Sequence, residues 1–238
     1  MKQTVARKPK RFEKSIFASG EYVQHFKPED KYNPFSGIYR QKKKDTVNII
    51  NKMDHSDSVL DVGGGMGRLS LALAQQSHRN IILSDISVDM LKLAMNNAGQ
   101  LNNLKVVNTD AHHLPYGDLT FDLIIGLDLV CHLNQPEIAL KEFHRVLKKD
   151  GMLIIDSTNS NPLWAFFYPR YMGKNPLNWI KVMRFGGVLP GWEKIVRHYP
   201  QKTFFSFLRR TGFKIVQNIN YGPVICPKWH LAVAKKTS

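Results

Sequence analysis

SVLDVGGGMGRLSLALA (residues 58–74) contains four glycines between an apolar run and a helical pattern. The run VLDVG (59–63) is typical of a buried strand, and RLSLALAQQ (68–76) places apolar residues at helical spacing. Glycines gathered between a strand and a helix let the backbone approach a ligand closely. This segment therefore predicts a strand–loop–helix unit with a ligand at the loop.

The same alternation of strands and helices continues on both sides of the loop. Further helices are expected at 37–53, 87–100 and 136–151, with Ser87 as an N-cap and Gly151 closing the last one. Further strands are expected at 80–86, 104–110, within 121–129 and at 152–158, and a helix and two strands follow residue 200. Apolar strands that alternate with helices favour an α/β fold with a doubly wound, mostly parallel, seven-stranded Rossmann-like sheet.

The composition is that of one globular domain. Of the 238 residues, 43% are hydrophobic and 22% charged, and no apolar run approaches the length of a membrane span. The N-terminus has no apolar segment of the signal-peptide type. Cys131 and Cys226 have no metal or redox spacing. We therefore expect a cytoplasmic protein in a reducing compartment, and we predict no metal ligands.

The residues in and around the glycine loop indicate which ligand it binds: a nucleoside triphosphate, a dinucleotide or a ligand without phosphate. A P-loop needs Lys-Ser/Thr after its second glycine, and the dinucleotide fingerprint needs a glycine where Arg68 stands. Asp61 lies just before the loop, where it repels a pyrophosphate but attracts an ammonium group. Asp85 ends the second strand, where a carboxylate accepts hydrogen bonds from ribose, and Asp110 ends the third, where it can meet an adenine amino group. A ligand with an ammonium group, a ribose and an adenine but no phosphate is S-adenosylmethionine.

These motifs resemble those of the class I S-adenosylmethionine-dependent methyltransferases. VLDVGGGMGRLS is similar to their first motif, LSDIS to their ribose-binding strand end, and NTDAHHLPYGDLTFDLI to their adenine strand and following loop. FHRVLKKDGMLII is similar to their helix and fifth strand. The resemblance covers residues 37–158 and, more weakly, 198–236. KYNPFSGIYRQKK and HYPQKTFFSFLRRTGF are similar to segments of the branch that methylates ubiquinone and menaquinone precursors.

The motifs and the resemblance together divide the chain. Residues 1–36 are expected to form a basic N-terminal extension that covers cofactor or substrate, and residues 37–158 the S-adenosylmethionine-binding core. Residues 159–200 are expected to form a helical and aromatic lid on the acceptor side, and residues 201–238 the last helix and two strands. The predicted cofactor-binding residues are Asp61, Gly63, Gly64, Gly65, Asp85, Ile86, Met90, Asp110, Ala111 and Leu127.

The expected reaction is methyl transfer to a small-molecule or lipid-like acceptor, such as a quinone precursor or another phenolic or anionic compound. A phenol or enol acceptor has to lose a proton. His132, in the segment after the fourth strand, is the predicted catalytic base, and His198 and Tyr171 are weaker candidates.

The charge is spread unevenly along the chain. Residues 58–156 carry eight Lys and Arg against eleven Asp and Glu, whereas residues 157–238 carry thirteen against the single acid Glu193. Basic residues among aromatic rings in 159–200 suit peripheral contact with an anionic membrane, and they equally suit an accessory core with a solvated basic face. Two alternatives to a small-molecule methyltransferase remain. One is an RNA or protein methyltransferase that uses the basic residues of 157–238, and the other is a non-catalytic S-adenosylmethionine-binding protein. Nucleic acid is the less favoured partner, because GLDL stands where amino-methylating nucleic-acid enzymes have Asn-Pro-Pro-aromatic.

Overall fold

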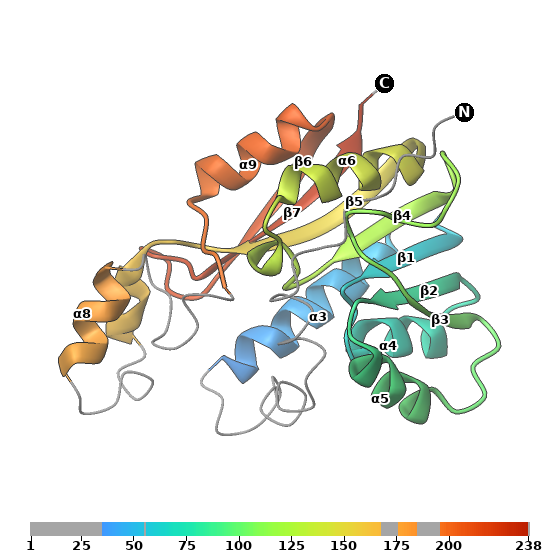
Figure 1. The fold of residues 1–238 in the computed structure, drawn as a ribbon, viewed down its shortest axis with the longest axis horizontal. Helices are drawn as coiled ribbons and strands as arrows, with labels where there is room; N and C mark the ends of the chain where they lie inside the picture. The colour runs from blue at the N-terminus through green and yellow to red at the C-terminus, as the bar shows by residue number, and fades with distance from the viewer. Residues whose placement is uncertain (1–34, 55, 168–175, 185–195, 238) are drawn as a thin grey trace, which may run out of the picture.

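A sheet with the strand order β3-β2-β1-β4-β5-β7-β6 lies at the centre of the molecule (Figure 1). The structure is a computed structural model, and it describes residues 35–54, 56–167, 176–184 and 196–237. Its strands are β1 (Ser58–Val62), β2 (Asn80–Asp85), β3 (Leu104–Asn108), β4 (Phe121–Gly126), β5 (Leu147–Thr158), β6 (Phe213–Tyr221) and β7 (Trp229–Lys236). Neighbouring strands from β3 to β5 pair in parallel, and β7 is antiparallel to both β5 and β6. The predicted doubly wound, mostly parallel sheet is confirmed.

Helices cover both faces of this sheet. One face carries α3 (Ser36–Asn51), α4 (Arg68–Gln76) and α5 (Val88–Ala98), and the other carries α6 (Pro136–Val146) and α9 (Gln201–Arg210) (Figure 1). The central strands are continuously apolar because successive side chains enter opposite cores. Leu123 and Ile125 of β4 share a core with α3 and α4, whereas Ile124 between them shares one with α6 and α9. Ser87 caps α5 as predicted, because its Oγ accepts the N–H of Met90 at 3.4 Å.

One difference from the sequence prediction lies between α6 and β5. The helix ends at Val146, not at Gly151, and the strand begins directly at Leu147. Leu147 continues the apolar spacing of the helix, but it pairs with Phe121 of β4 and is fully buried there. Strand pairing therefore overrides the helical pattern of these residues.

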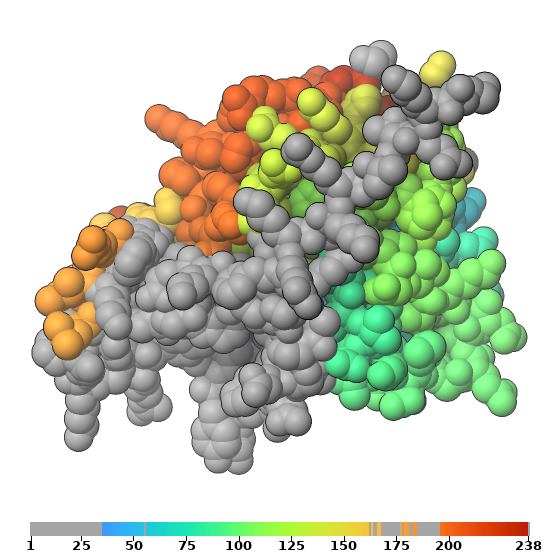
Figure 2. Space-filling model, viewed as in Figure 1, coloured from blue at the N-terminus to red at the C-terminus, as the bar shows by residue number. Residues whose placement is uncertain are grey.

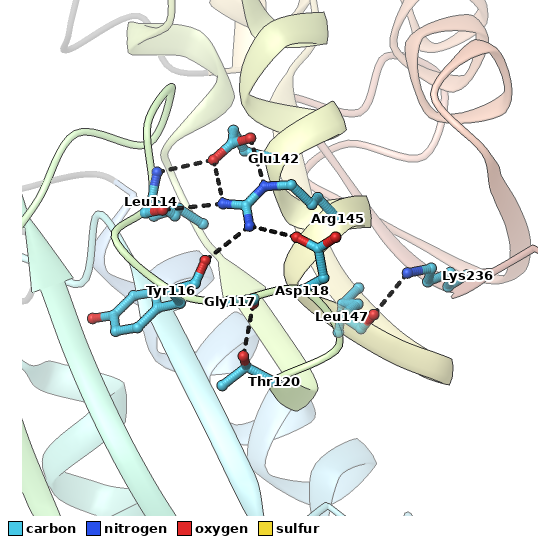
Figure 3. A network of polar contacts seen from close by, with 9 residues as sticks. All are labelled: Leu114, Tyr116, Gly117, Asp118, Thr120, Glu142, Arg145, Leu147 and Lys236. Atoms are coloured by element: carbon cyan, nitrogen blue, oxygen red, sulfur yellow. Dashed lines mark hydrogen bonds and ion pairs between the residues drawn. The ribbon is translucent and has the colours of Figure 1, made fainter. Parts of the chain in front are cut away.

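The connection from β3 to β4 contains no helix in the described structure and is fastened to α6 instead (Figure 3). The guanidinium of Arg145 donates hydrogen bonds to the backbone oxygens of Leu114 (3.1 Å) and Tyr116 (2.8 Å). It also binds both carboxylate oxygens of Glu142, at 2.9 and 2.8 Å. These bonds fasten residues 114–116, in the loop that begins at Asp110, to α6.

Part of the predicted lid lies outside the described residues, as do Tyr171 and residues 1–34 of the predicted N-terminal extension. Within the described part, η2 (Pro162–Phe167) and α8 (Pro176–Arg184) follow β5, and Figure 1 shows them beyond the end of the sheet. The ring centroids of Phe166 and Trp179 lie 5.2 Å apart, which joins η2 to α8. None of the helices in the described ranges has both the length and the apolar character needed to cross a membrane.

Candidate active site

The loop after β1 is built on positive φ angles. Gly63, Gly65 and Gly67 have φ values of 71°, 56° and 81°, in the region that favours glycine. The N–H groups of Gly63 and Gly64 donate to the backbone oxygen of Ser84, at 2.8 and 3.1 Å. The loop is therefore folded against the carboxyl end of β2.

Asp85, the last residue of β2, connects this loop to α5. Its Oδ2 accepts a hydrogen bond from the N–H of Gly65 at 2.9 Å, and its Oδ1 accepts one from the N–H of Ser87 at 2.8 Å. Burial raises the pKa of Asp85, and the backbone hydrogen bonds oppose this rise. Each carboxylate oxygen has a second lone pair, so Asp85 retains capacity for the ribose hydroxyls that the sequence analysis assigns to it.

Asp61 lies beneath the loop, in β1. Its side chain is buried and accepts a hydrogen bond from the hydroxyl of Ser70 in α4. Burial raises the pKa of Asp61 to about 6, and the charge of Asp85 adds to this effect while the Ser70 bond opposes it. A buried acid of this kind is stabilised in its charged form by a nearby cation, such as an ammonium group.

Asp110 follows β3 and is bound by its own loop. Its Oδ1 accepts the backbone N–H of His112 at 2.9 Å and lies 2.8 Å from Nδ1 of the same residue. The hydrogen bond from the His112 ring holds the pKa of Asp110 below its usual range, and burial opposes this. Asp110 is thus an ionised acceptor at the third strand end, and Ala111 beside it is buried.

The other predicted residues are spread along the same edge of the sheet. Ile86 follows β2 and is 36% exposed, whereas Met90, in the first turn of α5, is buried. Leu127 directly follows β4 and is half-buried. His132 is half-buried at the end of η1 (Val130–His132), the short helix after β4. Asp61, Asp85 and the glycine loop are thus linked through β2 by hydrogen bonds, and Met90 joins them through Ser87. The side-chain hydrogen bonds of Asp110 stay within its own loop.

A buried ion-pair cluster near the ends of β4 and β5 was not part of the predicted site. Nζ of Lys42, in α3, lies 2.6 Å from Oδ1 of Asp128 and also binds Oδ2 of Asp156. The N–H of Asp128 donates to Oδ1 of Asp156 at 2.6 Å. Burial acts to lower the pKa of Lys42, but the two carboxylates outweigh it and raise this pKa, while burial raises the pKa of Asp156. One cation therefore serves two carboxylates, and the cluster favours a further positive charge nearby.

Of the three residues in this cluster, only Asp156 could have been recognised from the sequence as needing a partner. Asp156 is an acid inside the apolar strand MLIIDST, and a charged residue at such a position calls for a partner. Lys42 is the first of three consecutive lysines, so nothing in the sequence distinguishes it from the other two.

The site fits S-adenosylmethionine. A Cβ built at Gly65 would meet no atom within 4 Å, so the loop backbone is open on that side. At Gly64 and Gly67 a Cβ would lie 2.8 Å from Asp61 and 2.9 Å from Leu83, so these two glycines serve internal packing. An open backbone beside several carboxylates suits a ligand with sulfonium and ammonium cations and ribose hydroxyls. The described residues contain no group of His, Cys, Asp and Glu that could hold a metal ion.

Known proteins with this architecture define the class. Residues 60–155 match a family model described as "Methyltransferase domain". The fold is similar to that of magnesium protoporphyrin IX methyltransferase from Synechocystis, which was solved with bound S-adenosylhomocysteine (SAH). The TM-score is 0.71 and the sequences are 18% identical. That similarity covers 96% of this chain and 100% of the other. The protein is a class I S-adenosylmethionine-dependent methyltransferase, as predicted.

Curated relatives narrow this class to a family. The ubiquinone/menaquinone biosynthesis C-methyltransferase of Marinomonas sp. is 30% identical over 208 residues, which cover 81% of this chain and 80% of the relative. The enzyme of the same name from Sinorhizobium fredii is 29% identical over 202 residues, which cover 78% and 76%. The chain belongs to the family of ubiquinone/menaquinone biosynthesis C-methyltransferases.

Proposed function

We propose that the protein methylates a ring carbon of a hydroxylated aromatic acceptor, of the kind from which ubiquinone or menaquinone is made. The observation that carries this proposal is the extent of the similarity to the relatives. The match to the methyltransferase domain spans residues 60–155, whereas the alignment with the Marinomonas C-methyltransferase spans 208 residues. The similarity therefore extends beyond the cofactor-binding core, into segments available for acceptor recognition.

The bound cofactor supplies a methyl group that is already activated as a sulfonium. The protein has to align the acceptor with that group and exclude water. Asp61, Asp85 and Asp110 are the candidates for holding the ammonium group, the ribose and the adenine amino group. A phenol also has to lose its proton before a ring carbon becomes strongly nucleophilic. The ring carbon in turn releases a proton after methyl transfer, and His132 is the candidate base for it, because η1 follows β4, the strand that pairs with β1 at the cofactor loop.

An RNA or protein acceptor is the alternative, because residues 157–238 carry thirteen Lys and Arg against one acid. The protein is incubated with S-adenosylmethionine labelled in its methyl group and with cell extract, which is then separated into lipid, RNA, protein and water-soluble fractions. We expect the label in the lipid fraction. Label confined to RNA or protein would overturn the proposed acceptor class and favour the alternative.

We also propose that η2 and α8 contact an anionic membrane surface. Their exposed apolar residues are between 38% and 63% exposed: Leu163, Phe166, Phe167, Leu177, Ile180 and Met183. Arg184, at the end of α8, is exposed beside them, and Figure 2 places the surface of α8 at one end of the molecule. Clustered apolar side chains on an exposed helix, next to basic residues, suit the headgroup level of a bilayer. Such contact would place the enzyme where a lipid-like acceptor dissolves.

Sedimentation with anionic vesicles at low salt tests this membrane contact. Ile180→Asp, in α8, is expected to reduce the bound fraction severalfold, because it places a negative charge in the apolar surface. Val216→Asp, on the exposed edge of β6, is the matched control and should bind as the unmodified protein does. Equal sedimentation of the two variants, or no sedimentation of the unmodified protein, would contradict the proposal.

A further inference from the structure

Lys228 is a buried lysine at the edge of the sheet where β5 ends and β7 begins. It is 4% exposed. Its N–H donates to the backbone oxygen of Tyr221 at 2.8 Å, and its carbonyl accepts the N–H of Asn159 at 2.7 Å. The backbone of Lys228 is therefore held on both sides, by the last residue of β6 and by the residue that follows β5.

The side chain of Lys228 contacts His198, whose neighbours in the chain are also held by backbone hydrogen bonds. Its Nζ lies 3.4 Å from Nδ1 of His198. The two neighbours of His198 are anchored through their backbone: Arg197 donates its N–H to the oxygen of Cys131 at 2.7 Å, and Tyr199 donates to the oxygen of Thr158 at 2.9 Å. The backbone of Lys228 and the backbone on both sides of His198 are therefore fixed by contacts with β6, β5 and η1 before any acceptor binds.

Lys42 and Lys228, two buried lysines near the end of β5, differ in the direction in which their pKa is shifted. Lys42 is paired with two carboxylates, which favour its charged form. Burial lowers the pKa of Lys228 well below its ordinary value, and the nearby thiol of Cys131 opposes this only in part. The amine of Lys228 therefore exchanges a proton more readily than a surface lysine does, and such groups are typical of functional sites.

Lys228 lies on the side of the sheet that extends from the cofactor loop through β4. From β4, which pairs with β1 at the loop, the sheet continues through β5 to β7. Adjacent strands are about 4.8 Å apart, so β7 lies roughly 10 Å from β4. Because the reacting ring carbon is ortho or para to the hydroxyl, the acceptor ring spans only part of this interval, and the methyl group of the cofactor and the side chain of Lys228 have to reach across the rest.

We propose that Lys228 and His198 bind the hydroxyl oxygen of a phenol or quinol acceptor and take up its proton. This inference rests on the proposed function. The acceptor O–H bond breaks, the proton passes to the amine of Lys228, and the ammonium so formed stays beside the oxyanion. The electron pair left on the acceptor is then available to the ring carbon that bonds the methyl carbon, while the methyl–sulfur bond breaks and its electron pair stays on the sulfur of the departing S-adenosylhomocysteine. When the ring becomes aromatic again, the oxygen regains its proton from Lys228, and the ring carbon releases one proton, for which His132 is the candidate acceptor.

A chromophoric phenol separates this role from a purely structural one. A nitrophenol, whose phenolate absorbs at longer wavelength than the phenol, is added to the protein loaded with S-adenosylhomocysteine, at a pH below the pKa of the free nitrophenol. We expect phenolate absorbance with the unmodified protein and with Lys214→Met, an exposed lysine on β6. The absorbance should be lost in Lys228→Met and reduced in His198→Gln. Calorimetry should give unchanged S-adenosylhomocysteine affinity in all three variants, which also checks that they are folded.

Methyl transfer to an unmethylated naphthoquinol is measured with the same variants. Lys228→Met is expected to lose about a hundredfold in rate, the usual contribution of a general base. If the variant keeps the full rate or the phenolate signal, the role of Lys228 is overturned while the proposed function stands. If the unmodified protein gives the phenolate signal but methylates no hydroxylated aromatic compound, the proposed function fails instead. Should Lys228→Met not fold, a reduced phenolate signal in a folded His198→Gln supports the proposal, and an unchanged signal overturns it.

Discussion

Asp85 joins the glycine loop, the end of β2 and the first turn of α5 through one carboxylate. Because two backbone N–H groups already hold it, the side chain has a fixed direction before the cofactor binds. Asp85→Ala should therefore weaken S-adenosylmethionine binding by about 1–3 kcal/mol, through the loss of charge-assisted hydrogen bonds to ribose. Asp89→Ala is the control, because Asp89 pairs only with Lys92 on the surface of α5 among the contacts described. Calorimetry that gives both variants the same affinity would remove Asp85 from the site.

Asp61 makes cofactor binding depend on pH. Its pKa is raised to about 6 in the free protein, mainly by burial. A cation bound beside Asp61 favours the carboxylate and lowers this pKa, so binding releases a proton when the pH is near or below 6. Affinity should therefore rise with pH up to about 7 and then level off, and it should be about tenfold weaker at pH 5. Calorimetry in buffers of different ionisation enthalpy measures the released proton, and affinity that does not change across this range would contradict the role of Asp61.

At the scale of elements, the ion-pair cluster fastens α3 to the strand ends beside the cofactor loop. Lys42→Met leaves Asp156 buried without its cation, and breaking a buried pair in this way costs about 3–5 kcal/mol. Lys44→Met, on the exposed side of the same helix, is the control and should change the free energy of unfolding by less than about 0.5 kcal/mol. Urea denaturation measures both variants. A loss below about 1 kcal/mol in Lys42→Met would mean that α3 is held by its apolar contacts alone.

The sequence predicts well those features that are marked by residues close to one another in the chain. The glycine loop, the acids at the ends of β2 and β3 and the N-cap Ser87 each stand beside the pattern that identifies them. The cluster of Lys42, Asp128 and Asp156 joins residues that are 86 and 114 positions apart in the sequence, and no local pattern marks such a contact. The boundary between α6 and β5 was missed for a related reason, since only the pairing of Leu147 with Phe121 shows that a helical pattern has become a strand.

For the whole molecule, the sheet divides at the switch point between β1 and β4, where α/β folds bind their ligands. The β3–β2–β1 side carries the acids and the loop that suit a cationic cofactor. The β5–β7 side carries the buried Lys228 beside the half-buried His198 and continues into η2 and α8. The proposed recognition of the acceptor uses side chains from separate elements on this second side, so the sequence predicts the cofactor in more detail than the acceptor.

The atom of the acceptor that receives the methyl group decides whether the protein is a C-methyltransferase of hydroxylated aromatic compounds. The purified protein is incubated with S-adenosylmethionine carrying a carbon-13 methyl group and with an unmethylated naphthoquinol, and the product is examined by carbon-13 NMR. We expect a methyl resonance typical of a carbon attached to an aromatic ring. A resonance typical of a methyl ether, or no methylated naphthoquinol from a protein that binds the cofactor normally, would contradict the proposed function.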